Sequence, residues 1–193
     1  NKKTLKELKD GSIVGTSSYS REFQLNRQNS KLKFKLIRGN VDTRLKKLND
    51  GLYDAIILSI VGIKFLGLEK YISQKFSTSE IIPSVGQGVI ALQCRKEDIE
   101  TQDILKNINH INTKSCVEAE RNILKVLEGD CETAIGAHAQ ITDGKISVEA
   151  ELFSLDGKKR FYLKSSKEVN SAGLLGKEVG KILKEKSENS YKK

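Results

Sequence analysis

The strongest constraint on the fold comes from residues 12–72, where short apolar runs alternate with segments of helical character. The runs "SIVGTSS", "KLKFKLIRG" and "YDAIILSI" predict strands, the last of them buried, while "SREFQLNRQ" and "VGIKFLGLEKYI" predict helices. A further helix is expected over "NVDTRLKKLNDG", with Asn40 as its N-cap and Gly51 just past its end. Strand–helix alternation at this spacing indicates an α/β layer with a largely parallel sheet.

The second half of the chain follows a different pattern. Helices are expected over 99–109 and 113–128, the second capped by Asn112 or Thr113. The runs "AIGAHAQI", "ISVEAELFSL" and "RFYLKSS" are joined by "TDGK" and "DGKK", and such Asp-Gly turns predict hairpins. A closing helix over 169–186 completes an α+β unit. Between the halves, "SVGQGVIALQCR" predicts a glycine-rich turn followed by an apolar strand.

Composition sets broad limits on the function. The 193 residues, 37% hydrophobic and 31% charged, are enough for one large or two small soluble domains. No apolar run approaches the roughly 18 residues of a membrane span, and the charged start is unlike a signal peptide. Thirty-four basic and 25 acidic side chains give a net charge of +9. That charge fits either a lysine-rich solvated surface or an anionic partner such as nucleic acid, phosphate or a polycarboxylate.

The three cysteines form no C-x-x-C pair, and only His110 and His138 could join them at a metal, so no metal site is expected. An odd number of cysteines without a secretory signal indicates a reducing compartment. Cys94 ends the expected apolar strand and is interpreted as a buried structural thiol, and Cys116 falls on the core face of its helix. Cys131 differs, because "LEGDCETAIG" places it at the tip of a loop, where its thiol can react.

Polar turns follow three strands of the first half: "VGTSSYSR", "IRGNVDTR" and "LSIVGIK". Ligands of parallel α/β sheets bind at the carboxyl ends of the strands, and helix N-termini there favour anions. The side chains in these turns are hydroxyl donors and guanidinium forks that match carboxylates, namely Thr16, Ser17, Ser18, Arg21, Arg38 and Arg44. The pattern predicts an anion site without identifying the anion. No Ser-His-Asp arrangement or P-loop accompanies it, and arginines without interleaved aromatic residues disfavour a nucleic-acid surface.

In this order and spacing, "VGTSS", "IRGNVDTRL", "YDAIILS", "GIKFLGL", "VGQG", "AERNIL" and "LEGDC" resemble the porphobilinogen deaminase (hydroxymethylbilane synthase) family of tetrapyrrole biosynthesis. The similarity runs from Val14 to about Gly144 and is weaker beyond. It implies a periplasmic-binding-protein-like α/β domain followed by a small α+β domain with an antiparallel sheet. The implied boundaries are 1–87 for the first of these, 88–110 for a segment returning to an absent first domain, and 111–193 for the cofactor-attachment domain.

The resemblance also implies a function. The family's enzymes are transferases of haem and chlorophyll biosynthesis that condense four porphobilinogen molecules into hydroxymethylbilane and release ammonia. Cys131 matches the cysteine that carries a dipyrromethane cofactor through a thioether. The resemblance assigns cofactor binding also to Ser18, Arg21, Arg38 and Arg44, and substrate binding to Thr16, Ser17, Arg21, Arg38 and Arg44. The expected partners are porphobilinogen and the growing linear polypyrrole, with no nucleic acid and no membrane.

The chain departs from the family pattern at several positions. Ser20 stands where a second arginine is common, and Phe65 where an arginine often follows the lysine. The cysteine loop, usually Gly-Gly-Cys followed by Val-Pro, here contains Asp130, Thr133 and Ala134. These departures bear on the number of carboxylate contacts and on the rigidity of the loop.

The family's catalytic aspartate belongs to a first domain that nothing in this sequence matches, so no catalytic residue is assigned here. The chain is expected to be a truncated form or a piece of a longer protein and to be inactive alone. The complete enzyme is expected to be a monomer of a bacterial cytoplasm or a plastid. The alternatives are a non-catalytic α/β anion-binding module, which explains the arginine turns but not the cysteine loop, and a basic nucleic-acid binder, which predicts steep salt dependence.

Overall fold

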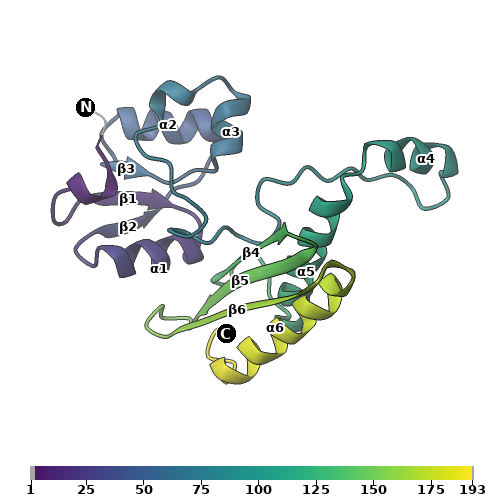
Figure 1. Ribbon diagram of the computed structural model, residues 1–193. Helices are drawn as coiled ribbons and strands as arrows, with labels where there is room; N and C mark the ends of the chain where they lie inside the picture. The colour runs from purple at the N-terminus through teal and green to yellow at the C-terminus, as the bar shows by residue number, and fades with distance from the viewer. Residues whose placement is uncertain (1–2, 193) are drawn as a thin grey trace.

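Residues 3–192 are described in the computed structural model, which has two lobes and a projecting arm (Figure 1). We call residues 3–81 the first lobe, 82–88 the connecting segment, 89–110 the arm and 111–192 the second lobe. The first lobe contains η1 (Leu5–Glu7), β1 (Ile13–Thr16), α1 (Tyr19–Gln28), β2 (Lys33–Leu36), α2 (Val41–Asn49), β3 (Ala55–Ile56), α3 (Ile60–Phe65) and η2 (Glu69–Tyr71).

The strands of the first lobe form a parallel sheet in the order β2-β1-β3, with Val14 paired to Phe34 on one side and Ala55 on the other. The chain moves outward from β1 to β2 and then back past β1 to β3. Right-handed crossovers in these opposite directions place α1 on one face and α2 with α3 on the other (Figure 1). The predicted α/β layer with a parallel sheet is confirmed.

Local chemistry sets the helix ends of this lobe, and the predicted cap at Asn40 and exit at Gly51 are confirmed. The side chain of Asn40 caps α2 by accepting a hydrogen bond from the amide of Thr43 at 2.8 Å. After α2 the chain turns at Gly51, whose φ of +76° is unfavourable for residues with a Cβ. Ser18 caps α1 in the same way, so α1 begins where the polar turn after β1 ends.

The second lobe is a three-stranded antiparallel sheet in the order β4-β5-β6, covered on one face by two helices. Its elements are α5 (Ile111–Leu127), β4 (Ile135–Thr142), β5 (Lys145–Phe153), β6 (Arg160–Glu168), η3 (Val169–Ser171) and α6 (Ala172–Ser187). Alternate residues of β5 from Ile146 to Leu152 are fully buried beneath these helices. The helices α5 and α6 touch closely, since a Cβ added at Gly176 would lie 2.1 Å from the carbonyl oxygen of Ala119.

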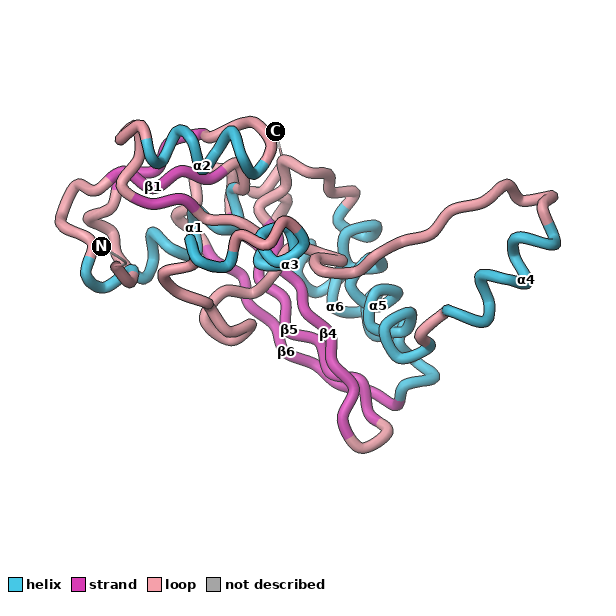
Figure 2. The backbone as a smooth tube through the Cα atoms, turned by 90° about the horizontal axis from the view of Figure 1, so that it is seen from above, coloured by secondary structure: helices cyan, strands magenta, loops and turns pink. Residues whose placement is uncertain are grey.

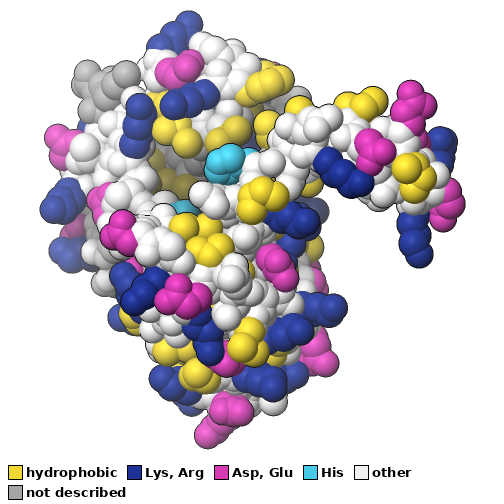
Figure 3. Space-filling model, turned by 45° about the vertical axis from the view of Figure 1, so that its right-hand side comes forward, with side chains coloured by type: hydrophobic (Ala, Val, Ile, Leu, Met, Phe, Trp, Pro, Cys, Tyr) yellow, Lys and Arg dark blue, Asp and Glu magenta, His cyan; other side chains and the backbone are white. Residues whose placement is uncertain are grey.

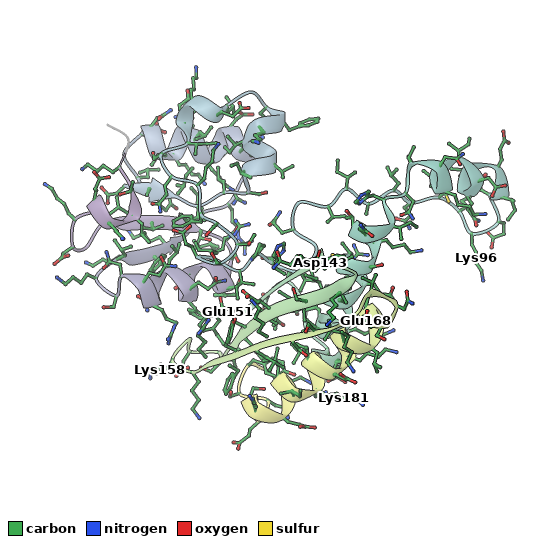
Figure 4. The ribbon with its side chains drawn as sticks, viewed as in Figure 1. Lys96, Asp143, Glu151, Lys158, Glu168 and Lys181 are labelled. Carbon is green, nitrogen blue, oxygen red and sulfur yellow. The ribbon has the colours of Figure 1, made fainter. Side chains whose placement is uncertain are left out.

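Both predicted hairpins are confirmed. Asp143 and Gly144 have φ values of +50° and +74°, the positive pair that a two-residue turn between twisted strands requires. The second turn contains Gly157 at φ +68° and is closed by a 2.6 Å hydrogen bond from Ser154 to Asp156. Figure 4 shows Asp143 and Lys158, one in each turn, at opposite ends of the sheet.

The apolar strand predicted after the glycine-rich turn does not form. Residues 89–95 have no regular secondary structure, and Val89, Ile90 and Leu92 are exposed. They lead into the arm helix α4 (Ile99–Ile108), which projects away from both lobes (Figure 2). A strand needs a neighbouring ladder, and no described strand lies beside this segment. Cys94 is accordingly half-buried in irregular backbone, which corrects the expectation of a buried thiol at a strand end.

Two smaller expectations are also corrected. The predicted buried strand over 53–60 is reduced to Ala55–Ile56, both half-buried, because β3 pairs with β1 at only two positions. The cap of α5 is His110, neither Asn112 nor Thr113, because the imidazole Nδ1 accepts the amide of Thr113 at 3.3 Å. Cys116 is half-buried and packs against the core of the second lobe, on the face that was predicted.

Side chains of α1 contact both the connecting segment and the second lobe. The amide group of Gln24 makes two buried hydrogen bonds with the backbone of Ile82, of 2.7 and 2.9 Å. The ring of Phe23 lies 5.7 Å, centroid to centroid, from that of Phe153 at the end of β5. On the face drawn in Figure 3, lysine and arginine side chains are scattered and interspersed with acids, which favours the solvated-surface interpretation for the charge on that face. None of the helices formed by residues 3–192 is long and apolar enough to cross a membrane.

Candidate functional site

The turn after β1 uses its hydroxyl groups to shape itself. Thr16 is buried, and its hydroxyl accepts a 3.2 Å hydrogen bond from the amide of Ser18. The Ser18 hydroxyl accepts from the amide of Arg21 at 3.4 Å and lies 3.0 Å from that of Ser20. Ser17 is the exposed residue between them. Thr16 and Ser18 therefore fix the backbone, while Ser17 remains exposed.

Arg44 joins this turn to the turn after β2. Its Nε donates to the carbonyl of Gly39 at 2.7 Å, and its Nη1 donates to the hydroxyl of Ser17 at 3.3 Å. Gly39 has φ +120°, a backbone conformation that residues with a Cβ rarely adopt. Arg38 is exposed, and its carbonyl accepts from Nζ of Lys47 at 2.9 Å. The two predicted turns thus meet at Ser17 and Arg44, with Arg38 beside them.

Arg21 brings in the third turn through Gln87. Nη2 of Arg21 donates to Oε1 of Gln87 at 2.9 Å, and Nε2 of Gln87 donates to the hydroxyl of Ser59 at 3.2 Å. Burial, together with the positive charge of Arg44, lowers the pKa of Arg21. Both guanidinium groups thus have neutral partners and lie close enough to repel. Such a pair binds carboxylates by charge-assisted hydrogen bonds.

The Cys131 loop begins where α5 ends. Asp130 accepts hydrogen bonds at Oδ1 from the amides of Glu132 (2.8 Å) and Thr133 (3.1 Å), and its own amide donates to the Thr133 hydroxyl at 3.0 Å. These bonds close a turn around Cys131, which is exposed as predicted. Asp130 and Thr133, two of the departures from the family pattern, therefore shape the loop by side-chain hydrogen bonding.

The base of the loop is held by the C-terminal end of the second lobe. Glu128 leaves α5 with φ +53°, and its carboxylate pairs with Lys192 and, at 3.1 Å, with Lys184. These cations lower the pKa of Glu128 to about 2. The hydroxyl of Tyr191 donates to the carbonyl of Leu127 at 3.0 Å.

The connecting segment contacts both the second lobe and Arg21 of the anion site. The amide of Ala137, in β4, donates to the carbonyl of Pro83 at 2.9 Å, and the amide of Gly86 donates to Glu120 at 2.7 Å. Gln87 comes next and holds Arg21. Cys131 belongs to the second lobe, four residues before β4 begins, whereas the arginines belong to the first lobe.

Sequence reasoning missed the residues that link these parts. Gln87, Ser59 and Glu120 each join segments far apart in the chain, and Lys47 joins α2 to the turn after β2. The "VGQG" motif was a visible signal for Gln87, because both glycines have positive φ and expose the side chain between them.

Within the described part of the chain, no group of three or more His, Cys, Asp or Glu residues could hold a metal ion.

Comparison with known proteins matches both halves of the chain to one family. Residues 1–103 match the description "Porphobilinogen deaminase, dipyromethane cofactor binding domain", and residues 114–185 match "Porphobilinogen deaminase, C-terminal domain". A porphobilinogen deaminase of Staphylococcus carnosus is 42% identical over 183 residues, which are 94% of this chain and 59% of that protein. One of Coxiella burnetii is 46% identical over 154 residues, 80% of this chain and 50% of that protein.

A third relative, from Desulforamulus reducens, is 40% identical over 179 residues, 93% of this chain and 58% of that protein. The chain thus spans about half the length of the curated relatives that it matches. The matches cover the parallel sheet with its arginine turns as well as the antiparallel sheet with its cysteine loop. The chain belongs to the porphobilinogen deaminase family.

Proposed function

We propose that this chain carries the cofactor and binds the substrate carboxylates of a porphobilinogen deaminase, the transferase that condenses four porphobilinogen molecules into hydroxymethylbilane with release of ammonia. The observation that carries the proposal is the exposed Cys131, held in a closed turn within a chain of this family. Residues 1–103 match the family's cofactor-binding domain, which supports dipyrromethane as the group attached.

The donor set fits such a group. The dipyrromethane cofactor, built from two porphobilinogen units, carries acetate and propionate groups, and when bound it would supply the pyrrole to which the first substrate is joined. Cys131 Sγ would supply the sulfur of the thioether, and its exposed position leaves room for a bulky substituent. The connecting segment links the lobe of Cys131 to the arginine turns, where Arg21 and Arg44 have only neutral hydrogen-bond partners.

The arginines would hold the acetate and propionate groups of porphobilinogen. Arg21 stays protonated because even a lowered guanidinium pKa lies far above neutrality. A carboxylate entering between Arg21 and Arg44 relieves their mutual repulsion and can take two parallel hydrogen bonds from either fork. Arg38, exposed at the end of β2, and the Ser17 hydroxyl extend the same surface. Fixed forks would orient the pyrrole for reaction.

We expect the chain alone to show no turnover, because the resemblance assigns the catalytic aspartate to a part of the protein that this sequence does not match. The chain, alone and expressed behind the N-terminal part of the Staphylococcus carnosus relative, would be incubated with porphobilinogen while hydroxymethylbilane is followed. Full turnover by the chain alone would show that an acid among its own residues suffices. The complete enzyme is proposed to be a monomer, and the bacterial origin of the relatives compared supports a bacterial cytoplasm over a plastid.

Cys131→Ser in the joined protein tests the attachment site. The intact mass should lose the covalent adduct in Cys131→Ser and retain it in the matched controls Cys94→Ser and Cys116→Ser. An adduct at full occupancy in Cys131→Ser would refute the assignment. Binding of porphobilinogen without any adduct in the unsubstituted protein would favour the non-catalytic anion-binding alternative.

Arg38→Leu and Arg44→Leu test the anion site in the same protein. Each removes a charge-assisted hydrogen bond worth roughly 1.5–3 kcal/mol, so affinity or turnover should fall on the order of tenfold or more. Arg27→Leu, on the exposed side of α1, is the control and should have little effect. Unchanged kinetics in both variants would reduce these arginines to surface charges.

A further inference from the structure

A carboxylate is buried between the connecting segment and the second lobe. Glu120 lies on α5 with only 6% of its surface exposed. Its Oε2 accepts the amide of Gly86 at 2.7 Å, and its Oε1 accepts the amide of Ala139, in β4, at 2.9 Å. One side chain therefore ties α5 to the edge strand of its own sheet and to the connecting segment, which follows the first lobe in the chain.

Burying this charge is unfavourable, and the surroundings offset only part of the penalty. Burial raises the pKa of Glu120, while the amides of Ala139 and Gly86 and the His138 ring act in the opposite direction. The ring nitrogen Nδ1 of His138 lies 3.9 Å from Oε1, and Cys116 faces the carboxylate from the preceding turn of α5. An apolar side chain would fill a core position of α5 without this penalty. What the carboxylate provides, and an apolar side chain would not, is a hydrogen-bond acceptor for each of two backbone amides, those of Gly86 and Ala139.

The Gly86 amide is held by Glu120 and lies one residue before Gln87, which binds Arg21. Gln87, the following residue, is exposed and holds Arg21 and Ser59. Gly86 and Gly88 on either side have φ values of +68° and +83°. Packing therefore does little to orient Gln87, and the backbone between the two glycines sets where its amide group points. The hydrogen bond from Gly86 to Glu120 holds that backbone.

We propose that Glu120 is a positioning residue of the anion site, which acts from the second lobe by fixing Gly86 and thereby the hydrogen bond between Gln87 and Arg21. The placement of the guanidinium is then coupled to the lobe that bears Cys131. That the bound anion is a porphobilinogen carboxylate rests on the proposed function. The coupling itself does not, since every contact in it lies within the described residues.

The first test uses the 193-residue chain and needs no ligand. In Glu120→Gln the side chain offers one oxygen acceptor and turns an NH₂ group toward the other amide, so Gly86 or Ala139 loses its partner. Hydrogen exchange at that amide should accelerate at least tenfold, and the NMR signals of the Arg21 guanidinium should shift or broaden. Tyr191→Phe, which removes a buried hydrogen bond elsewhere in the same lobe, is the control and should leave Arg21 unchanged. Glu120→Met, apolar and similar in length, removes both acceptors, and it is the deciding variant if Glu120→Gln folds poorly or if only the Ala139 amide exchanges faster.

A double-mutant cycle separates positioning from a purely structural role. If Glu120 acts through Gln87, then Glu120→Gln should alter the Arg21 signals in the unsubstituted chain and have no further effect in Gln87→Ala. Faster exchange at Gly86 with unchanged Arg21 signals would overturn the proposal, as would additive effects in the cycle.

The second test uses the joined protein with porphobilinogen. Glu120→Gln should raise KM about three- to tenfold with a smaller change in kcat, and the increase should vanish in the Gln87→Ala background. A fall in kcat alone, with KM unchanged, would contradict positioning of the anion site. If the unsubstituted protein forms no hydroxymethylbilane, the proposed function fails, and the Arg21 signals still decide the role of Glu120.

Discussion

The two lobes differ in how they use their residues. In the second lobe the strands are eight or nine residues long, and the largest cluster of buried apolar residues described there has 15 members. In the first lobe the strands are two to four residues long, and the corresponding cluster has four. The first lobe instead carries the turns with Ser17, Arg21 and Arg44. We expect the second lobe to be the stable scaffold and the first the more easily opened, ligand-binding part.

The largest effect should come from a cavity in the scaffold. Ile123 is fully buried in the second-lobe cluster, and Ile123→Ala should lower the free energy of unfolding by about 4 kcal/mol. Leu25→Ala, equally buried in the first lobe, should lower it by about 2 kcal/mol because half-exposed neighbours can move into the space. Urea unfolding followed by circular dichroism measures both. Equal losses would contradict the contrast between the lobes.

The next largest effect on stability should come from the close packing of α6 against α5. Gly176→Ala would place a methyl group 2.1 Å from a backbone oxygen of α5 and should destabilise the protein by about 2–3 kcal/mol. Gly62→Ala, in α3 of the first lobe, meets only Val41 at 3.7 Å and should be neutral or stabilising by up to about 1 kcal/mol. Thermal melts of the two variants should therefore move in opposite directions or differ widely. A harmless Gly176→Ala would mean that α5 and α6 can separate without loss.

The link between the first lobe and the connecting segment should have an intermediate effect on stability. Gln24→Ala leaves the buried amide and carbonyl of Ile82 without partners and should cost about 1–2 kcal/mol. Gln28→Ala, one turn further along α1, removes an exposed hydrogen bond to Glu80 and should change stability by about 0.5 kcal/mol or less. Hydrogen exchange of the Ile82 amide identifies the cause. Its protection should be lost in Gln24→Ala and kept in Gln28→Ala.

The smallest effect should be electrostatic. Lys192 and Lys184 lower the pKa of Glu128 from 4.5 to about 2, so their pairing stabilises the fold above pH 4.5. This stabilisation is lost as the pH falls toward 2. Glu128→Gln should lower Tm by no more than a few degrees at pH 7, since the pairs are exposed. The Tm difference from the unsubstituted chain should close between pH 4.5 and 2. A difference that persists at pH 2 would have another origin.

Features encoded by neighbouring residues were predictable from the sequence. The cap at Asn40, the exit at Gly51 and the turn at Asp143–Gly144 each follow from the conformational preferences of one or two residues. The exposure of Cys131 followed from its loop, and the arginines were expected near one sheet edge because parallel strands end together.

Features that depend on a distant partner were not predictable. The run after Gly88 has the composition of a strand but no described ladder beside it. His110 caps α5 although asparagine and threonine follow it, because its ring nitrogen meets the Thr113 amide. Gln87 and Glu120 gain their roles only once the connecting segment lies against β4 and α5. A motif such as "VGQG" can mark an exposed side chain, but sequence pattern does not show which distant partner that side chain meets.

The hydrogen bond from Tyr191 and the ion pair of Lys192 at the base of the cysteine loop have a practical consequence for protein engineering. A purification tag or fusion partner attached after residue 193 would disturb Tyr191 and Lys192. These two residues bind Leu127 and Glu128, at the start of the segment leading to Cys131. The same addition before residue 1 would join the first lobe, and within residues 3–192 the side chains bound to Leu127 and Glu128 come from the second lobe. Fusions at the leading end should therefore leave the thiol in its native setting, and those at the trailing end should not.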